Sequence, residues 1–390
     1  MKWPLCRFEE VALPTKGAIV SGPFGSNISS RFFVEEGVPV IRGNNLTFGQ
    51  RRFIDDGFVY LREEKAQEFR NCVAITDDLV FTAAGTIGQV GIIPADTRFD
   101  RYIISNKQLR VRCDRSKVNP LFLFLWFTTE EMRQHIINKN TGCSIPLINL
   151  GILRGLPVPN PPLAVQERIA STISTYDDLI ENNRRRMALL EESARTLYRE
   201  WLVSLHFPGH EHARIVDGVP EGWEPGCVSD FYDTASGGTP SRTNPDFFTG
   251  ETPWVKTQEL LNGFVTETEE KITEDALRRS AAKVFPDRTV LVAMYGATIG
   301  QIGIIASPAA SNQACCAIIP RDTRASFVHA FLFFLENKDK LVGLSMGAAQ
   351  NNINQQIIRS YPMVMPTRRL AQLFQDTLTP VFEQWLNLHR

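Results

Sequence analysis

One ten-residue segment occurs twice in this chain of 390 residues. The sequence Ala-Gly-Thr-Ile-Gly-Gln-Val-Gly-Ile-Ile at residues 84–93 returns as Gly-Ala-Thr-Ile-Gly-Gln-Ile-Gly-Ile-Ile at residues 296–305. Further matches follow in the same order: residues 21–26 with 236–241, residues 39–44 with 253–258, and Ser105-Asn106 with Ser311-Asn312. The spacing between partners only shrinks along the chain, as loop deletions in one copy would produce. We therefore predict two copies of one folded module.

The composition is that of a globular protein. Hydrophobic residues make up 43% and charged residues 22% of the chain, and the length suits two or three domains. The first residues lack the apolar core of a signal peptide, and no apolar run reaches the roughly 20 residues that span a bilayer. We expect a cytoplasmic protein that does not contact membranes. The net charge of −1 excludes a protein that coats nucleic acid by charge alone.

Both copies have the pattern of a mixed α/β domain, at residues 1–158 and 223–365. Short apolar runs bounded by Gly, Asp or Pro predict strands at 38–41, 79–81, 90–93 and 108–112, and at 254–255, 289–293, 302–305 and 317–319. A helix is expected over 121–137 and another from Ser326 to about Lys340. The predicted fold class is α+β, with two tandem α/β domains separated by long helices.

Residues 159–205 have the pattern of a coiled-coil helix. Apolar residues alternate at spacings of four and three, interrupted by one polar position, at Ile169, Ile173, Tyr176, Ile180, Asn183, Met187, Leu190, Ala194, Leu197 and Trp201. This is a heptad repeat. A second helix over 366–390 carries Leu370, Phe374, Val381, Trp385 and Leu388, and residues 206–222 link the parts. We predict that the two helices pack antiparallel; the alternative is a helix buried against its own globular domain.

Few residues suggest catalysis. Asn160-Pro161-Pro162-Leu163 resembles an amino-methyltransferase motif, but Leu163 replaces the aromatic that stacks the target base, and prolines there suit the start of a helix. His206, His210 and His212 lie in a linker beside Glu211 and are more typical of a solvated loop than of a metal site. Seven cysteines without a C-x-x-C pair predict reduced packing residues. We predict no catalytic residue, metal or cofactor in this chain.

Polar turns occupy equivalent positions in the two copies but differ in side chain. Arg, Lys, Asn and Gln read base edges in the major groove, with Ser and Thr as adaptable donors; each alone is more often a structural turn residue. The first copy offers Ser26, Asn27, Arg42, Asn44, Asn45, Asn106, Lys107 and Ser144. The second offers Ser241, Arg242, Lys256, Thr257, Gln258, Asn312, Gln313, Asn351 and Asn352. Such a pair of modules would read two different DNA sequences. The repeated Thr-Ile-Gly-Gln segment could cradle a phosphate or serve only the turn.

The sequence resembles the specificity subunit of type I restriction–modification enzymes. The residues that carry the resemblance are 21–27 through 39–45, 236–242 through 253–260, both Thr-Ile-Gly-Gln segments and residues 161–169. The resemblance implies two pseudo-twofold-related target-recognition domains that each bind half of a split site in double-stranded DNA. It also implies an antiparallel coiled coil that sets the gap between half-sites.

Partners follow from the same resemblance. Two modification subunits would dock on the coiled coil, bind S-adenosylmethionine and methylate adenine, and restriction subunits would use ATP and Mg²⁺ for translocation and cleavage. One departure is that the second helix ends at Arg390, after about half of the length expected. The competing hypotheses are a protein-binding scaffold without DNA specificity and a self-sufficient methyltransferase built on residues 160–163.

Overall fold

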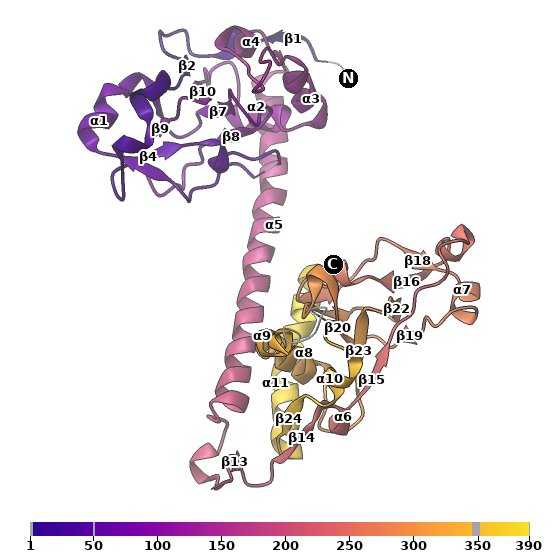
Figure 1. The fold of residues 1–390 in the computed structure, drawn as a ribbon. Helices are drawn as coiled ribbons and strands as arrows, with labels where there is room; N and C mark the ends of the chain where they lie inside the picture. The colour runs from indigo at the N-terminus through magenta and orange to yellow at the C-terminus, as the bar shows by residue number, and fades with distance from the viewer. Residues whose placement is uncertain (1–2, 50, 345–351, 390) are drawn as a thin grey trace. The chain divides into compact units, whose positions relative to one another are not determined.

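The duplication is present in the three-dimensional structure. The computed structural model describes residues 3–49, 51–344 and 352–389, and the chain divides into two compact units, Met1–Ile180 and Glu181–Arg390. Each unit mixes strands and helices in the same order (Figure 1). The predicted α+β class with two tandem domains and long helices is therefore confirmed. Among the helices of the described residues, none has both the length and the apolar character needed to cross a bilayer.

Unit 1 contains two main sheets. The first has the order β2-β10-β7-β8, with β2 Ile19–Ser21, β10 Gln108–Val111, β7 Leu79–Thr82 and β8 Val90–Ile92. The second has the order β3-β5-β4-β9-β6, with β3 Phe33–Val34, β5 Val59–Leu61, β4 Val38–Ile41, β9 Tyr102–Ile104 and β6 Val73–Ala74. β1 (Leu5–Arg7) pairs with β11 (Pro157–Pro159). The helices are α1 Glu63–Glu68, α2 Pro120–Phe127, α3 Glu130–Asn138 and α4 Leu150–Arg154.

Unit 2 repeats this plan. One sheet is β15-β23-β20-β21-β17, with β15 Tyr232–Ser236, β23 Cys315–Pro320, β20 Val290–Ala293, β21 Ile302–Ile305 and β17 Gly263–Val265. The other is β18-β16-β22-β19, with β18 Lys271–Ile272, β16 Thr252–Val255, β22 Ala309–Ser311 and β19 Val284–Phe285. β14 (Glu224–Cys227) pairs with β24 (Pro362–Met365), and β12 (Ile215–Val216) with β13 (Val219–Pro220). The shorter helices are α6 Val228–Phe231, α7 Glu274–Arg278, α8 Phe327–Glu336, α9 Lys338–Gly343 and α10 Gln355–Arg359. β16 pairs parallel with β22 as β4 does with β9.

The single helices predicted over 121–137 and 326–340 were wrong, because each is two helices. In unit 1 the break falls at Thr129, whose hydroxyl accepts a hydrogen bond from the Met132 amide at 3.3 Å and caps α3. A threonine that caps a new helix competes with continuation of the preceding one. Leu123 and Phe127 of α2 are fully buried, whereas α3 has one buried and one exposed face. Apolar content predicted the helices, but not the cap between them.

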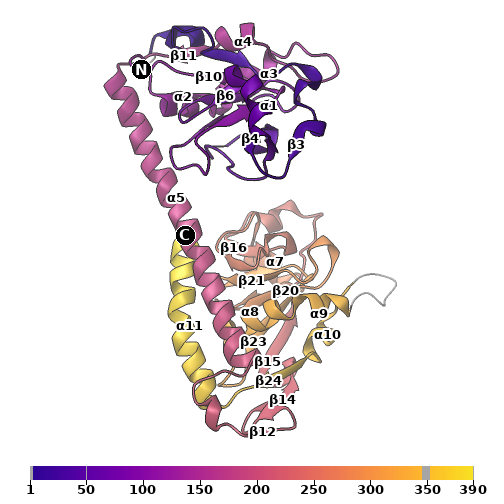
Figure 2. The same ribbon diagram turned by 90° about the vertical axis from the view of Figure 1, so that its left-hand side faces the viewer.

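The long helices are α5 (Leu163–Tyr198), which continues as a π-helical turn Arg199–Val203, and α11 (Arg368–His389). Within unit 2 the end of α5 lies beside the start of α11, and the two run antiparallel (Figure 2). The Phe374 ring centroid is 6.2 Å from that of Tyr198 and 5.9 Å from that of Trp201. The predicted antiparallel packing is confirmed for this part of α5.

The predicted seam is not continuous, which corrects the prediction of one heptad seam from Ile169 to Trp201. Ile169 and Ile173 pack against the core of unit 1, whereas Tyr176 and Ile180 are 64% and 48% exposed and Asn183 is half-buried. The members that pack in the core of unit 2 are Met187, Leu190, Ala194, Leu197, Trp201, Phe374, Val381 and Trp385. Leu370 packs in a separate small cluster with Phe207 and Trp223.

Length explains the interruption. The 22 residues of α11 extend about 33 Å, against about 54 Å for the 36 residues of α5. α11 therefore covers only part of α5. The heptad positions of α5 pack against the core of unit 1 at the start of the helix and in the core of unit 2 at its end. The alternative of burial against a globular domain holds for the first turns of α5.

Burial of His329 predicts that stability depends on pH. This α8 side chain is 4% exposed and its Nδ1 lies 2.9 Å from the Tyr232 hydroxyl. Burial lowers the pKa of His329 from 6.5 to about 4, so the unfolded chain binds this proton more tightly than the folded one. The contribution of this shift to the free energy of unfolding is therefore fully present above pH 6.5 and is lost as the pH falls toward 4. For a shift of this size the total loss is roughly 3 kcal/mol.

Urea denaturation at several pH values will measure this dependence. A His329→Gln variant should be less stable than wild type at pH 7, and the difference should shrink as the pH approaches 4. A difference that stays constant with pH would contradict the assignment.

Candidate nucleic-acid interface

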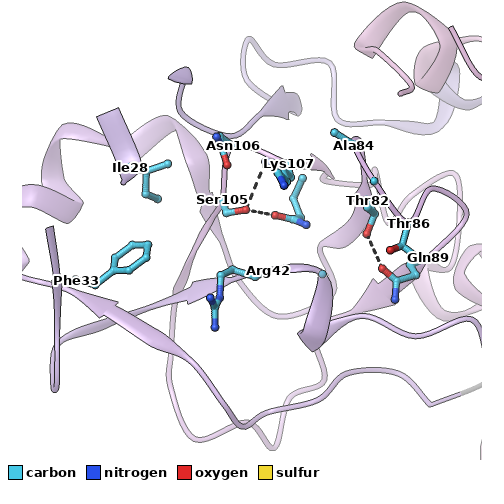
Figure 3. A pocket seen from close by; sticks show the side chains of 13 residues that line it. Ile28, Phe33, Arg42, Thr82, Ala84, Thr86, Gln89, Ser105, Asn106 and Lys107 are labelled. Carbon is cyan, nitrogen blue, oxygen red and sulfur yellow. Dashed lines mark hydrogen bonds between the residues drawn. The ribbon is translucent and has the colours of Figure 1, made fainter. Parts of the chain in front are cut away.

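A cavity of about 380 Å³ in unit 1 brings together predicted DNA-binding residues that are far apart in the sequence. Arg42 directly follows β4, Asn106 and Lys107 precede β10, and the repeated segment contributes Thr86 and Gln89. Figure 3 shows Ile28 and Phe33 on one side of Ser105, and Thr82, Thr86 and Gln89 on the other. The full lining is Ile28, Phe33, Arg42, Gly43, Thr82, Ala84, Gly85, Thr86, Gln89, Ser105, Asn106, Lys107 and Gln108.

The wall of this cavity contains a buried donor without an acceptor. Gln108 is 1% exposed, and its Oε1 accepts a hydrogen bond from the Ser105 hydroxyl. Its Nε2 has no hydrogen-bond partner among the described residues, and neither has the buried Nε of Arg42. A buried unpaired donor costs about 1–3 kcal/mol. Asn106 and Lys107 were predicted to bind DNA here, whereas Gln108, the next residue of the same polar run, was not among the predicted contacts.

The repeated segment builds a tight turn at the edge of the cavity. Gly85 and Gly88 have φ of +94° and +92°, as Gly296 and Gly300 have +82° and +76° in unit 2. A Cβ at Gly300 would lie 2.6 Å from a methyl carbon of Val342 on α9, and a Cβ at Gly88 would lie 3.3 Å from Ile137 on α3. The repetition is thus explained by left-handed backbone and by close approach of the turn to a helix.

Gln89 links this turn to its surroundings. Its Oε1 accepts from the Thr82 hydroxyl at 3.1 Å and its Nε2 donates to the Leu46 carbonyl at 3.1 Å. Thr86 is exposed at the rim. The segment therefore shapes the cavity, and whether it also meets a phosphate stays a prediction.

Asn45 does not face the cavity, contrary to the expectation that it binds DNA. It is fully buried, its Oδ1 accepts from the Arg42 amide, and its Nδ2 donates to the carbonyls of Ile54 and Asp56, each at 2.9 Å. Both polar atoms of the Asn45 side chain thus bond to backbone groups, and these bonds stabilise the turn after β4. Asn44 is exposed, with Nδ2 3.2 Å from the Gly57 carbonyl.

The other predicted residues of unit 1 lie on exposed loops outside the cavity lining. Ser26 and Asn27 are exposed in the loop after β2, and Ser144 is exposed before α4. These residues are accessible to a ligand but are not gathered with Arg42 and Lys107.

In unit 2 the predicted cations are paired with carboxylates. The Lys256 ammonium lies 2.5 Å from Glu269 Oε2 and 3.3 Å from Glu270 Oε1, and Arg242 Nη1 lies 2.8 Å from Glu270 Oε2. The hydrogen bond to Glu269 raises the pKa of Lys256, and the Arg242 guanidinium also stacks 4.1 Å from the Phe248 ring centroid. An approaching phosphate would have to compete with these carboxylates.

The remaining candidates of unit 2 occupy turns equivalent to those of unit 1. Asn312 and Gln313 precede β23 as Asn106 and Lys107 precede β10. Gln313 accepts a hydrogen bond from the Thr239 hydroxyl. The others are half-buried Thr257 and exposed Ser241, Gln258 and Asn352. Asn351 lies outside the described residues.

The residues considered for catalysis form structural contacts. The Asn160 amide donates to the Pro4 carbonyl at 3.0 Å, and Leu163 is the first residue of α5. Buried Gln166 accepts from the Asn119 amide at 2.9 Å and donates to the Pro161 carbonyl at 2.8 Å, so residues 160–163 join β11 to α5. His206 Nδ1 lies 2.9 Å from Glu200 Oε2. Among the described residues, no group of three His, Cys, Asp or Glu side chains is arranged to hold a metal ion.

Comparison with known proteins gives one consistent family. The sequence profile described as "Type I restriction modification DNA specificity domain" matches residues 34–192 and 220–383. The HindI specificity subunit of Haemophilus influenzae is 22% identical over 75% of this chain and 77% of its own length. The MjaIX specificity subunit of Methanocaldococcus jannaschii is 22% identical over 90% of this chain and 81% of its own. In fold, the chain is similar to a type I restriction-modification S subunit from M. genitalium, with a TM-score of 0.67, 12% identity, and coverage of 100% and 93%.

Proposed function

Because the chain belongs to the family of type I restriction-modification DNA specificity proteins, we propose that it recognises a split site in double-stranded DNA, one half with each unit. The observation that carries this proposal is the cavity of unit 1, where Arg42, Asn106 and Lys107 converge. These are donors that suit the acceptor atoms of guanine and adenine in the major groove. Equivalent turns in unit 2 carry different side chains, as two different half-sites require.

The chemistry then belongs to partner proteins. Two modification subunits would bind S-adenosylmethionine and methylate adenine, and restriction subunits would use ATP and Mg²⁺. Two observations support a recognition role without catalysis. Residues 160–163 are committed to the junction before α5, and the net charge of −1 leaves many phosphate contacts to other subunits. Tyr176 and Ile180 on α5 are exposed apolar residues available to such a partner. The whole assembly would work in the cytoplasm.

Mapping methylated bases tests the proposal. Cells that lack other restriction systems should show a split adenine-methylated motif when they express this chain together with the modification subunit of its own system. Expression of either protein alone should give no such motif, and the purified chain alone should bind DNA weakly.

Two results would contradict parts of the proposal. Methylation by the purified chain alone would overturn the non-catalytic role. A stable complex with the modification subunit that has no sequence preference would favour a scaffold that binds only proteins.

A further inference from the structure

Phe24 is an aromatic side chain left almost entirely in water. It lies between β2 and the 3-10 helix Gly25–Ile28 and is 90% exposed. Burying a phenylalanine side chain stabilises a folded protein by about 1.5–3 kcal/mol. The exposed Phe24 ring does not contribute this free energy. The neighbours along the loop are polar, because Ser26 and Asn27 are exposed beside it. Phe24 is thus a single apolar group among hydrogen-bonding side chains.

The loop that carries Phe24 is held at both ends. Pro23 and Ile28 are buried, and the Gly22 amide donates to the Gln108 carbonyl at 3.0 Å. A Cβ at Gly22 would lie 1.9 Å from the Ser105 carbonyl oxygen, so only glycine allows the loop to lie this close to the turn before β10. The Asn27 amide closes the loop onto the Phe24 carbonyl at 3.2 Å. The exposed ring is therefore presented by an anchored backbone.

These anchors place Phe24 beside the candidate cavity. Ser105, on which Gly22 rests, lines that cavity, and so does Ile28 at the other end of the loop. Exposed Lys107 follows Ser105 on the same wall. The loop that carries the ring is thus anchored on residues that line the cavity.

Unit 2 keeps the anchor and changes the side chain. A Cβ at Gly237 would lie 2.2 Å from the Ser311 carbonyl oxygen, as at Gly22 and Ser105. The residue equivalent to Phe24 in the matched segments is Thr239, whose hydroxyl donates to Gln313. The same backbone support therefore carries an aromatic ring in one unit and a polar side chain in the other.

We propose, on the basis of the proposed function, that Phe24 inserts at a base step of the half-site bound by unit 1 and unstacks it. Apolar side chains that enter a duplex between two base pairs partially unstack that step and kink the DNA. A protein partner is disfavoured as the occupant, because protein interfaces bury contiguous apolar patches, whereas the exposed residues that follow Phe24 in its loop are Gly25, Ser26 and Asn27. Unit 2, with Thr239, leaves the corresponding step stacked.

The test uses the complex of this chain with its modification subunit, bound to duplexes that carry 2-aminopurine at successive positions. Fluorescence should rise at one step of the unit 1 half-site and at none of the equivalent steps of the other. Phe24→Ala should abolish the rise and weaken binding of the site by roughly tenfold to a hundredfold, in line with the loss of one aromatic–base contact. Phe24→Trp should retain both. Leu5→Ala, which removes a 62% exposed apolar side chain from β1, should change neither.

The outcomes separate this proposal from the proposed function. Specific binding and methylation by wild type without any fluorescence change would overturn the insertion and leave the function standing. A Phe24→Ala variant that loses the modification subunit would also overturn it, since the ring would then contact protein. Failure of the wild-type complex to select any split site would overturn both.

Discussion

Exchanging residues 1–158 for the first module of another family member will change one half of the methylated motif and leave the other half as it was. Unit 1 forms its own sheets, its own apolar core and the cavity that gathers Arg42, Asn106 and Lys107. The side chains expected to read the first half-site therefore all travel with the exchanged segment. The side chains expected to read the second half-site stay in place, because they lie in unit 2, on η9 (Thr257–Glu259) and before β23.

The exchange should be made at two junctions. A junction at residue 158 divides β11, which pairs with β1, and leaves behind Ile169 and Ile173, which pack against the core of unit 1. A second chimera joined at residue 180, the boundary of unit 1, carries these contacts along. Both chimeras should yield hybrid motifs when methylated DNA is sequenced, and the reciprocal exchange of residues 223–365 should alter only the other half. A change in both halves from one exchange would refute modular recognition.

The duplication made most of the fold predictable. Once residues 84–93 were matched with 296–305, each strand expected in one copy had a counterpart in the other, and β7, β8, β10, β20, β21 and β23 are all present. The heptad pattern predicted α5, α11 and their antiparallel packing, but not that the first turns of α5 pack against the core of unit 1. A periodic apolar face predicts that the face is buried, but it does not predict which surface covers it. Ile169 therefore packs against the core of unit 1, whereas the Trp201 ring packs against that of Phe374.

The candidate site was predictable only in part, because turn residues have two uses. Arg42 and Asn45 were equally plausible base readers, yet the Asn45 amide is consumed by backbone groups. Gln108 ends the polar run that begins at Asn106 but was not among the predicted contacts; its unpaired nitrogen depends on the packing around it. For Phe24 a signal was present: an aromatic between Pro23 and Gly25 stands opposite Thr239 in the matched segment. Its exposure, however, follows from tertiary anchoring.

Arg42→Ala will lower methylation of the specific site and relax one base position of the unit 1 half-site. Arg42 directly follows β4 and lines the cavity, and its Nε has no hydrogen-bond partner in the part of the chain that the structure describes. A bidentate contact from arginine to guanine contributes about 1–3 kcal/mol of discrimination, which corresponds to a tenfold to hundredfold loss. Methylated motifs from cells expressing the variant should show the relaxed position.

Two further variants decide whether Arg42 reads a base or only supplies charge. Arg42→Lys keeps the charge but cannot form the planar fork, so it should restore nonspecific affinity and leave the position relaxed. Arg115→Ala, which removes an exposed guanidinium paired with Asp77 outside the cavity lining, should leave the motif unchanged. Full recovery of specificity by lysine would contradict readout by the planar guanidinium of Arg42. Because its Nη2 also lies 3.4 Å from the Gly57 carbonyl, thermal denaturation of each variant must show that the turn after β4 is intact. With that turn intact, a relaxed position can be attributed to the missing guanidinium, and the cavity of unit 1 is then where the half-site is read.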